Sequence, residues 1–153
     1  SLHDALPILL LKLIDEQKKL SDQYQRFVPL AVKLSPDETT EELKRIAELI
    51  ATIGISAIIA TNTTCTREDV AALPHGQEIG GLSGAPLLHR STECLKIIKA
   101  TVGNSVDLIG VGGIDSLAAA QEKMQAGANL LQVYTGLIYA GPHLVSELVH
   151  GLH

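Results

Sequence analysis

Gly110-Val111-Gly112-Gly113-Ile114-Asp115 is the stretch of sequence that decides the fold. It lies between an apolar run at residues 106–109 and a segment at residues 116–126 that has the composition of a helix. A glycine-rich turn between a strand and a helix lets the backbone come close to an anion, and the first N–H groups of the helix point toward it. A second turn of this kind, Tyr134-Thr135-Gly136, follows the next apolar run. The two turns predict a phosphate site shared by neighbouring strand-to-helix loops, a recurrent feature of (β/α)8 barrels.

Composition places the chain among globular α/β proteins. Its 153 residues are 46% apolar, 19% charged and 3% aromatic, which suits a parallel sheet with an Ile, Leu, Val and Ala core. The net charge is −5 and the basic residues are scattered, which argues against a nucleic-acid partner. Cys65 and Cys94 have neither a CxxC nor a zinc-type spacing, so we expect free thiols and no metal site. No apolar run approaches the roughly 18 residues that a membrane span requires.

The first eight residues need separate treatment. Ser1-Leu-His-Asp-Ala-Leu-Pro-Ile8 is similar to the translation of a common sequencing adapter. We therefore expect residues 1–8 to be non-native and residues 9–153 to form the domain. An adapter joined to a coding sequence also leads us to expect that the natural protein extends upstream.

Apolar strands and amphipathic helices alternate along the remainder of the chain. Strands are expected at residues 27–34, 55–60, 106–109 and 129–134. Helices are expected at residues 9–26, from the capping box of Thr39 and Glu42 to Gly54, from a cap at Ser91 or Thr92 to Val102, and at residues 116–126. A last helix is expected from about Gly141, with Leu144, Val145 and Leu148 on one side. Strict alternation implies a parallel sheet with right-handed crossovers. Residues 65–89 form a long irregular loop, and loops of this length are usually functional.

Polar or glycine residues lie at the carboxyl ends of the four expected strands: Lys33, Asn62, Gly113 and Tyr134. Barrels and open α/β sheets both bind ligands at this face, so position alone does not separate them. The glycine turns after the last two strands, together with the expected upstream region, favour half of a (β/α)8 TIM barrel built from four parallel βα units.

Five motifs carry a resemblance to a known family. They are Ala31-Val-Lys-Leu-Ser-Pro36, Ala60-Thr-Asn-Thr-Thr64, Gly80-Gly-Leu-Ser-Gly84 with Pro86-Leu87, Ile109-Gly-Val-Gly-Gly-Ile-Asp115 and Tyr134-Thr-Gly136. In order and spacing they resemble the C-terminal half of class 2 dihydroorotate dehydrogenase, the quinone-dependent enzyme of pyrimidine synthesis. The resemblance runs from about Leu10 to the end of the chain and implies barrel strands five to eight of a protein that holds FMN.

The resemblance also implies the roles of individual residues. FMN would be bound by Lys33, Thr61, Gly84, Gly113, Tyr134 and Thr135, and dihydroorotate or orotate by Asn62 and Thr63. In this family a serine base removes a proton from dihydroorotate while hydride passes to the flavin, which then reduces quinone. The serine and the N-terminal helices that meet quinone would lie upstream. We therefore expect a parent protein that is peripheral on the cytoplasmic side of the inner membrane, and a soluble, catalytically inactive chain here.

Alternatives stay open at this point. The chain could come from a soluble class 1 dihydroorotate dehydrogenase, although the aromatic Tyr134 favours class 2. It could instead be a non-catalytic phosphate-binding half-barrel that self-associates through its open edges. Lys33 could be a rim lysine, and Asn62 and Thr63 could merely cap a loop.

Overall fold

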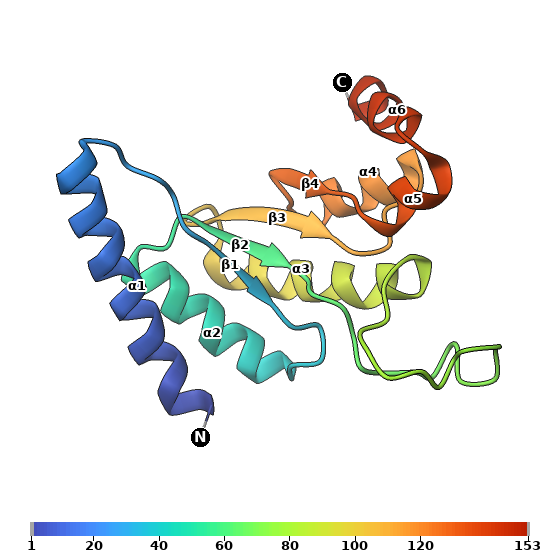
Figure 1. Cartoon of the computed structure of the whole chain (residues 1–153), viewed down its shortest axis with the longest axis horizontal. Helices are drawn as coiled ribbons and strands as arrows, with labels where there is room; N and C mark the ends of the chain where they lie inside the picture. The colour runs from blue at the N-terminus through green and yellow to red at the C-terminus, as the bar shows by residue number, and fades with distance from the viewer. Residues whose placement is uncertain (1, 153) are drawn as a thin grey trace.

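The computed structural model describes residues 2–152, and side chains from residue 6 to residue 152. Its elements are α1 (Leu2–Tyr24), β1 (Ala31–Leu34), α2 (Thr40–Ile53), β2 (Ala57–Ala60), the short 3₁₀ helix η1 (Ala85–Leu87), α3 (Leu88–Val102), β3 (Asp107–Val111), α4 (Leu117–Gln125), β4 (Leu130–Gln132), α5 (Thr135–Ala140) and α6 (His143–Leu152) (Figure 1). The expected alternation of strands and helices is confirmed.

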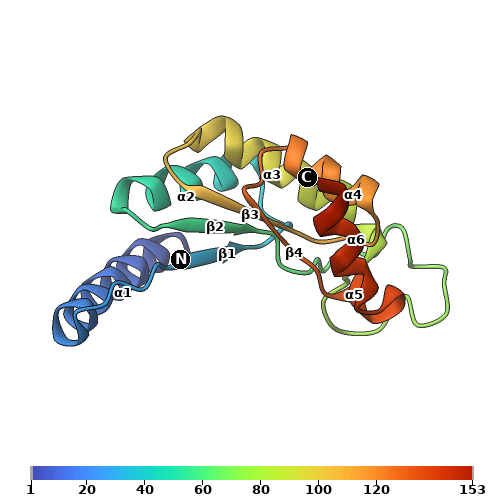
Figure 2. The ribbon, with the colours of Figure 1, turned by 90° about the horizontal axis from the view of Figure 1, so that it is seen from above.

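All strand pairs are parallel, and the strands lie side by side in chain order, β1-β2-β3-β4. Helices α2, α3 and α4 cover one face of this sheet (Figure 2). The strand register places Lys33, Ile59, Ile109 and Leu130 in one row across the opposite face. All four are exposed or half-buried, so we call this row the open face.

The main core lies between the sheet and helices α1, α2 and α3. Its buried members include Leu34, Ile58 and Leu108 from the strands and Leu43, Ala47, Ile50, Leu95, Ile98 and Val102 from α2 and α3. A second cluster of Ile114, Ala120, Leu144 and Leu148 joins α4 to α6. The four-strand sheet is therefore stabilised mainly from the face that the helices cover.

The capping box at the start of α2 is confirmed. The backbone N–H of Glu42 donates to Thr39 Oγ1 over 3.2 Å, and the backbone N–H of Thr39 donates to Glu42 Oε2 over 3.1 Å. Gly54 ends the helix with φ 82°, a conformation that glycine adopts without strain.

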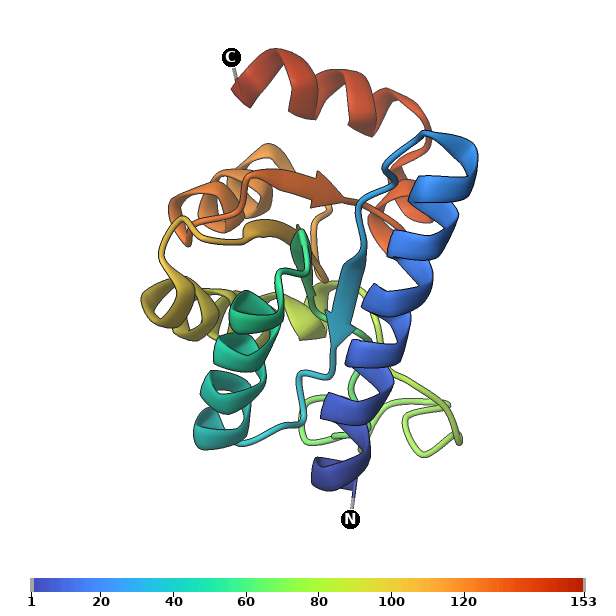
Figure 3. The ribbon, with the colours of Figure 1, turned by 90° about the vertical axis from the view of Figure 1, so that its left-hand side faces the viewer.

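The N-terminal elements differ from the expected ranges. Helix α1 begins at Leu2 rather than Leu9, and it packs beside α2 at the β1 edge of the sheet through the buried Leu10 (Figure 3). That residues 1–8 are non-native stays a prediction. Strand β1 begins at Ala31, and Phe27 and Val28 are 63% and 57% exposed. The expectation of a buried strand from residue 27 was wrong, because β1 is an edge strand with a sheet neighbour on one side only.

The expected cap of α3 was also wrong. The helix begins at Leu88, so Ser91 and Thr92 lie inside its first turns and are buried. Their hydroxyls donate to the carbonyl oxygens of Leu87 and Leu88, each over 2.8 Å. This bond to the carbonyl four residues earlier satisfies a buried hydroxyl within a helix and removes the need for a capping role.

The C-terminal region forms two helices where one was expected. Helix α5 precedes Gly141, which has φ 77°, and α6 follows it. Leu144 and Leu148 face the core, whereas Val145 is 45% exposed. The expected placement of Val145 on the inner side was wrong, since the axis of α6 is set by its packing against α4.

We predict that Thr39→Ala lowers the free energy of unfolding by about 1 kcal/mol, because the Glu42 N–H loses its acceptor Thr39 Oγ1 and the Thr39 hydroxyl no longer donates to the Glu42 carboxylate. Urea denaturation of the purified chain measures the change. Thr52→Ala is the matched control, since Thr52 Oγ1 only donates to the Glu48 carbonyl within the same helix. Equal losses in both variants would contradict a stabilising cap.

Candidate ligand pocket at the carboxyl ends of the strands

A pocket of about 560 Å³ opens at the carboxyl ends of the strands. It is lined by Lys33, Thr61, Asn62, Thr63, Ser83, Gly84, Leu87, Val111, Gly112, Gly113, Ile114, Gln132, Val133, Tyr134, Thr135 and Gly136. All eight residues singled out from the sequence are among them, although they come from four separate strand ends. Pockets of this size accommodate cofactors and other small ligands.

The two glycine turns meet in this pocket. A Cβ atom on Gly113, where φ is 76°, would lie 2.5 Å from Leu88 Cβ and 2.6 Å from the Leu88 backbone nitrogen. A Cβ atom on Gly136 would lie 2.2 Å from the Ile114 carbonyl oxygen. The first turn thus packs on the start of α3 and the second turn packs on the first, so both positions require glycine.

The long loop after β2 returns to the second turn. Thr64 and Leu82 exchange two backbone hydrogen bonds, of 3.1 and 2.8 Å, which bring the end of the loop back to the sheet. The Ser83 and Thr135 hydroxyl oxygens are 2.9 Å apart, and Gly84 adopts φ 82° beside Thr135. The loop therefore supplies one wall of the pocket.

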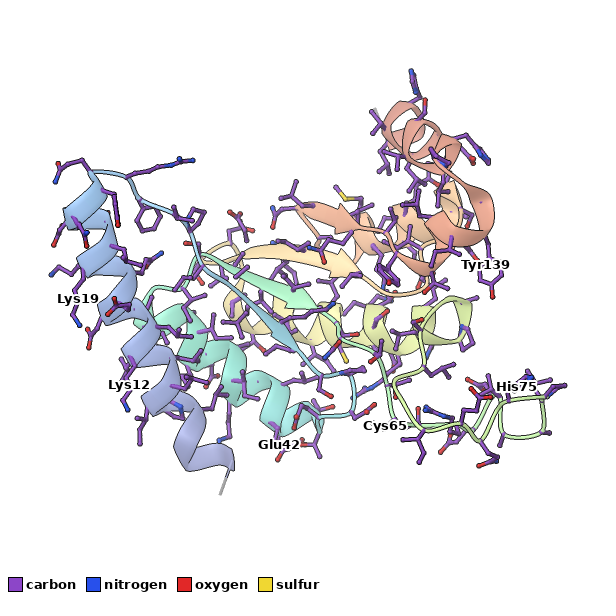
Figure 4. The ribbon with its side chains drawn as sticks, viewed as in Figure 1. Lys12, Lys19, Glu42, Cys65, His75 and Tyr139 are labelled. Atoms are coloured by element: carbon purple, nitrogen blue, oxygen red, sulfur yellow. The ribbon has the colours of Figure 1, made fainter. Side chains whose placement is uncertain are left out.

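Farther out, the same loop projects away from the pocket. Cys65 lies near the start of this loop, and His75 lies toward its tip, where its ring is 2.6 Å from Glu78 Oε1 (Figure 4). The guanidinium of Arg67 donates to the carbonyls of Glu78 and Gly80 and so ties the two arms of the loop together.

The end of β2 presents the polar residues expected to contact a ligand. Thr61 is buried, and the peptide bond that precedes it is cis. The Thr61 N–H donates to the Val111 carbonyl over 3.2 Å, and the Thr61 hydroxyl donates to the Asn62 carbonyl over 2.9 Å. The Asn62 N–H donates to the Leu34 carbonyl over 2.7 Å, which joins the ends of β1 and β2. The Asn62 and Thr63 side chains are exposed at the pocket. Both offer hydrogen-bonding groups to a ligand.

The charges around the pocket favour an anion. Among the described residues that line it, Lys33 is the only charged one. Its side chain is exposed at the pocket rim, a position that agrees with the rim lysine considered from the sequence and that also leaves the ammonium open to a ligand. A glycine-rich wall with one cation and no carboxylate among the described lining residues suits phosphate and other anionic groups.

Sequence reasoning missed a buried lysine behind the first glycine turn. Lys123 on α4 is fully buried, and its ammonium donates to Ser91 Oγ and, over 3.4 Å, to the Leu88 carbonyl. Burial lowers the pKa of Lys123 to about 8. The signal was present in the sequence, because Lys123 follows the buried Ala119 and Ala120 at helical spacings of four and three residues.

The two cysteines take no part in the pocket lining. Cys65 is exposed, and Cys94 is buried in α3, where burial raises the pKa of its thiol. Within residues 2–152, no cluster of His, Cys, Asp and Glu side chains suits a metal ion. Among the helices of the same described residues, none combines the length and apolar character needed to cross a bilayer.

A parallel α/β sheet with a glycine-lined pocket at the carboxyl ends of its strands is the usual ligand-binding region of α/β proteins, whether barrels or open sheets. A family model described as dihydroorotate dehydrogenase matches residues 4–153. The chain therefore belongs to the dihydroorotate dehydrogenase family. Its four parallel βα units match part of the TIM barrel of that family, which confirms the fold class expected from the sequence.

Curated relatives cover almost the whole chain. It is 59% identical over 150 residues to "Dihydroorotate dehydrogenase (quinone)" of Legionella pneumophila (strain Corby), covering 98% of this chain and 45% of the relative. It is 49% identical over 146 residues to the protein of the same name from Aeromonas hydrophila, covering 95% of this chain and 44% of the relative. The chain thus spans less than half the length of these relatives.

Solved structures of DHODH from Eimeria tenella share the fold. The complex with ferulenol superposes with a TM-score of 0.76 at 36% identity, over 80% of this chain and 32% of that chain. The ligand-free form gives the same TM-score and identity, over 80% of this chain and 34% of that chain.

We predict that Lys123 makes the free energy of unfolding rise with pH between about 8 and 10.5. The folded-state pKa of Lys123 is about 8 against an ordinary 10.5, so in this window Lys123 holds more protons in the unfolded chain than in the folded chain. The raised pKa of the Cys94 thiol acts in the opposite direction above about pH 9. The slope from this one residue is at most about 1.4 kcal/mol per pH unit. Urea denaturation across this range measures it.

Lys123→Met removes the titrating lysine and is expected to lower the slope of the free energy of unfolding against pH, relative to the original chain. Lys44→Met is the matched control, because Lys44 is exposed on α2, and it should keep the slope of the original chain. A Lys123→Met variant that retained the full slope would show that another group causes it.

Proposed function

We propose that this chain is the FMN- and orotate-binding part of a quinone-dependent dihydroorotate dehydrogenase, which oxidises dihydroorotate to orotate. The observation that carries the proposal is the convergence of all eight sequence-selected residues on one pocket. The match of residues 4–153 to the family adds support. The activity and partners belong to the parent protein, of which the chain spans about 45% in its relatives.

The residues present fit FMN as a ligand. Gly84, Gly113, Tyr134 and Thr135 would hold the ribityl phosphate, because two glycine backbones, a hydroxyl and the start of α5 line the pocket. Lys33 would approach the pyrimidine ring of the flavin, and Thr61 would contact the cofactor at the end of β2. The absence of carboxylates among the described lining residues removes a source of repulsion toward the phosphate.

Asn62 and Thr63 would bind the substrate. A side-chain amide offers both a donor and an acceptor, which matches the alternating N–H and C=O groups at the edge of dihydroorotate or orotate. When bound, FMN supplies the hydride acceptor and then passes electrons to quinone. Lys33 would place a positive charge where negative charge develops on the flavin. The serine base that removes the substrate proton is proposed to lie in an upstream segment.

The acceptor is proposed to be quinone rather than the acceptor of a class 1 enzyme. Both relatives described above carry quinone in their names. The resemblance adds Tyr134 at the second turn, an aromatic residue at a position where class 1 sequences usually lack one. Quinone would meet the parent protein through an upstream region at the cytoplasmic side of the inner membrane. No nucleic-acid partner is proposed.

We predict that the purified chain binds FMN and that Lys33→Met weakens binding of FMN and riboflavin alike by about tenfold, because the lysine acts on the ring that both flavins share. Quenching of flavin fluorescence gives both dissociation constants. Lys44→Met on the exposed side of α2 is the control with the same change of charge. A Lys33→Met variant that affects only FMN would move this lysine to the phosphate.

We predict no orotate formation by the chain as given, even when it is saturated with FMN, because the proposed base is not among its residues. The assay follows orotate absorbance with dihydroorotate and a quinone or dye acceptor. A measurable rate from the purified chain would contradict the assignment of the base to an upstream segment.

The open face supports the alternative of a self-associating half-barrel. Leu130 is 61% exposed, and β1 and β4 are both edge strands of the described sheet. Edge strands and exposed apolar rows favour association. Size-exclusion chromatography with an absorbance scan separates the two functions: a yellow species supports flavin binding, and a colourless dimer of defined size supports a non-catalytic module.

A further inference from the structure

Lys123 is a buried cation directly behind the first glycine turn. It is fully buried, and no carboxylate forms an ion pair with it among the residues that the structure describes. Its ammonium instead donates to Ser91 Oγ and to the Leu88 carbonyl. A buried charge without a counterion is costly, so its position calls for an explanation beyond packing.

Ser91 connects this lysine to the pocket wall. Ser91 is fully buried, and its Oγ accepts a hydrogen bond from Lys123. Its single hydrogen is shared between the Leu87 carbonyl oxygen at 2.8 Å and the Gly112 carbonyl oxygen at 3.1 Å. Gly112 lines the pocket, whereas neither Lys123 nor Ser91 reaches it. The lysine can therefore act on a ligand through Ser91 and the backbone of the turn.

The direction of one peptide plane follows from this contact. The Gly112–Gly113 peptide is trans, since the cis bond of the described chain lies at Ala60–Thr61. In a trans peptide the C=O and N–H groups point in opposite directions. With the Gly112 carbonyl turned inward to Ser91, the Gly113 N–H is turned outward to the pocket. This N–H has no hydrogen-bond partner within residues 2–152, so it is available to an anion.

We propose that Lys123 is a positioning residue for the phosphate of the ligand: through Ser91 it holds the Gly112 carbonyl inward, and the Gly113 N–H is thereby presented to the phosphate. The inference deepens the proposed function and rests on it. It concerns the phosphate alone, because Lys33, the charged residue of the described pocket lining, lies at the end of β1 rather than behind the glycine turn.

The positive charge of Lys123 gives the arrangement a second consequence. A phosphate bound on the other side of the turn is a counterion in a poorly solvated site, and it favours the charged ammonium. The titratable groups that act on Lys123 are Glu122 on its own helix and Cys94 on α3. Because burial lowers the pKa of Lys123 to about 8 before the ligand binds, phosphate binding above this pH is accompanied by proton uptake.

The test compares FMN with riboflavin, which lacks the phosphate. In the original chain, FMN binds more tightly than riboflavin. Lys123→Met keeps the length of the side chain and removes its charge; we expect it to reduce the preference for FMN by about tenfold and to leave riboflavin affinity unchanged. Fluorescence quenching measures both ligands. Lys123→Arg should restore part of the preference, because it returns the charge and the donor.

Two further measurements separate positioning from a merely structural role. Calorimetry of FMN binding near pH 8.5, in buffers of different ionisation enthalpy, should report uptake of a fraction of a proton by the original chain and none by Lys123→Met. Ser91→Ala breaks the connection while keeping the charge, so it should also reduce the preference for FMN. This variant carries the test if Lys123→Met does not fold.

The possible failures are distinguishable. If the original chain binds neither flavin, the proposed function fails and the inference fails with it. If the original chain prefers FMN while Lys123→Met and Ser91→Ala keep the full preference, only the role of Lys123 is overturned. Equal weakening of FMN and riboflavin in both variants would also overturn it, because a general disturbance of the pocket does not select for phosphate.

Discussion

Close contact between backbones, made at two glycines, holds the pocket together. Gly113 lies so near Leu88, and Gly136 so near the Ile114 carbonyl, that a side chain at either position would collide with main-chain atoms. The start of α3, the first turn and the second turn therefore form one packed unit. Backbone atoms cannot move aside as the end of a side chain can, so the relative position of the two turns is firmly set.

Two lysines at different depths give the pocket its electrostatic character. Lys33 is exposed at the rim at the end of β1, whereas Lys123 is buried on α4. Interactions of a buried charge are screened less by water and salt than those of an exposed one. Under the proposed function the two cations therefore divide the ligand between them, with Lys33 beside the flavin ring and Lys123 acting on the phosphate through Ser91 and Gly112.

The two faces of the sheet have different surroundings. Helices α2 and α3 bury Leu34, Ile58 and Leu108 on one face, while the row from Lys33 to Leu130 stays open on the other. In a closed barrel the inner face is filled by side chains from all strands. The chain spans about 45% of its Legionella relative, and under the proposed function the remainder of the parent protein would cover the open face.

The sequence by itself determined the alternation of strands and helices, the Thr39 capping box and both glycine turns, because each depends on a local pattern. It also determined that Lys33, Asn62, Gly113 and Tyr134 lie together, because the carboxyl ends of parallel strands lie at one edge of a sheet; the other site residues were implied by the resemblance. It did not predict the start of α3 at Leu88, the separation of α5 from α6, or the exposed approach to β1. Only the tertiary structure placed Lys123 and Ser91 behind Gly112. Ser91 is 32 positions from Lys123 and 21 positions from Gly112 in the chain. Their contacts therefore depend on how α3, α4 and β3 pack rather than on any local pattern.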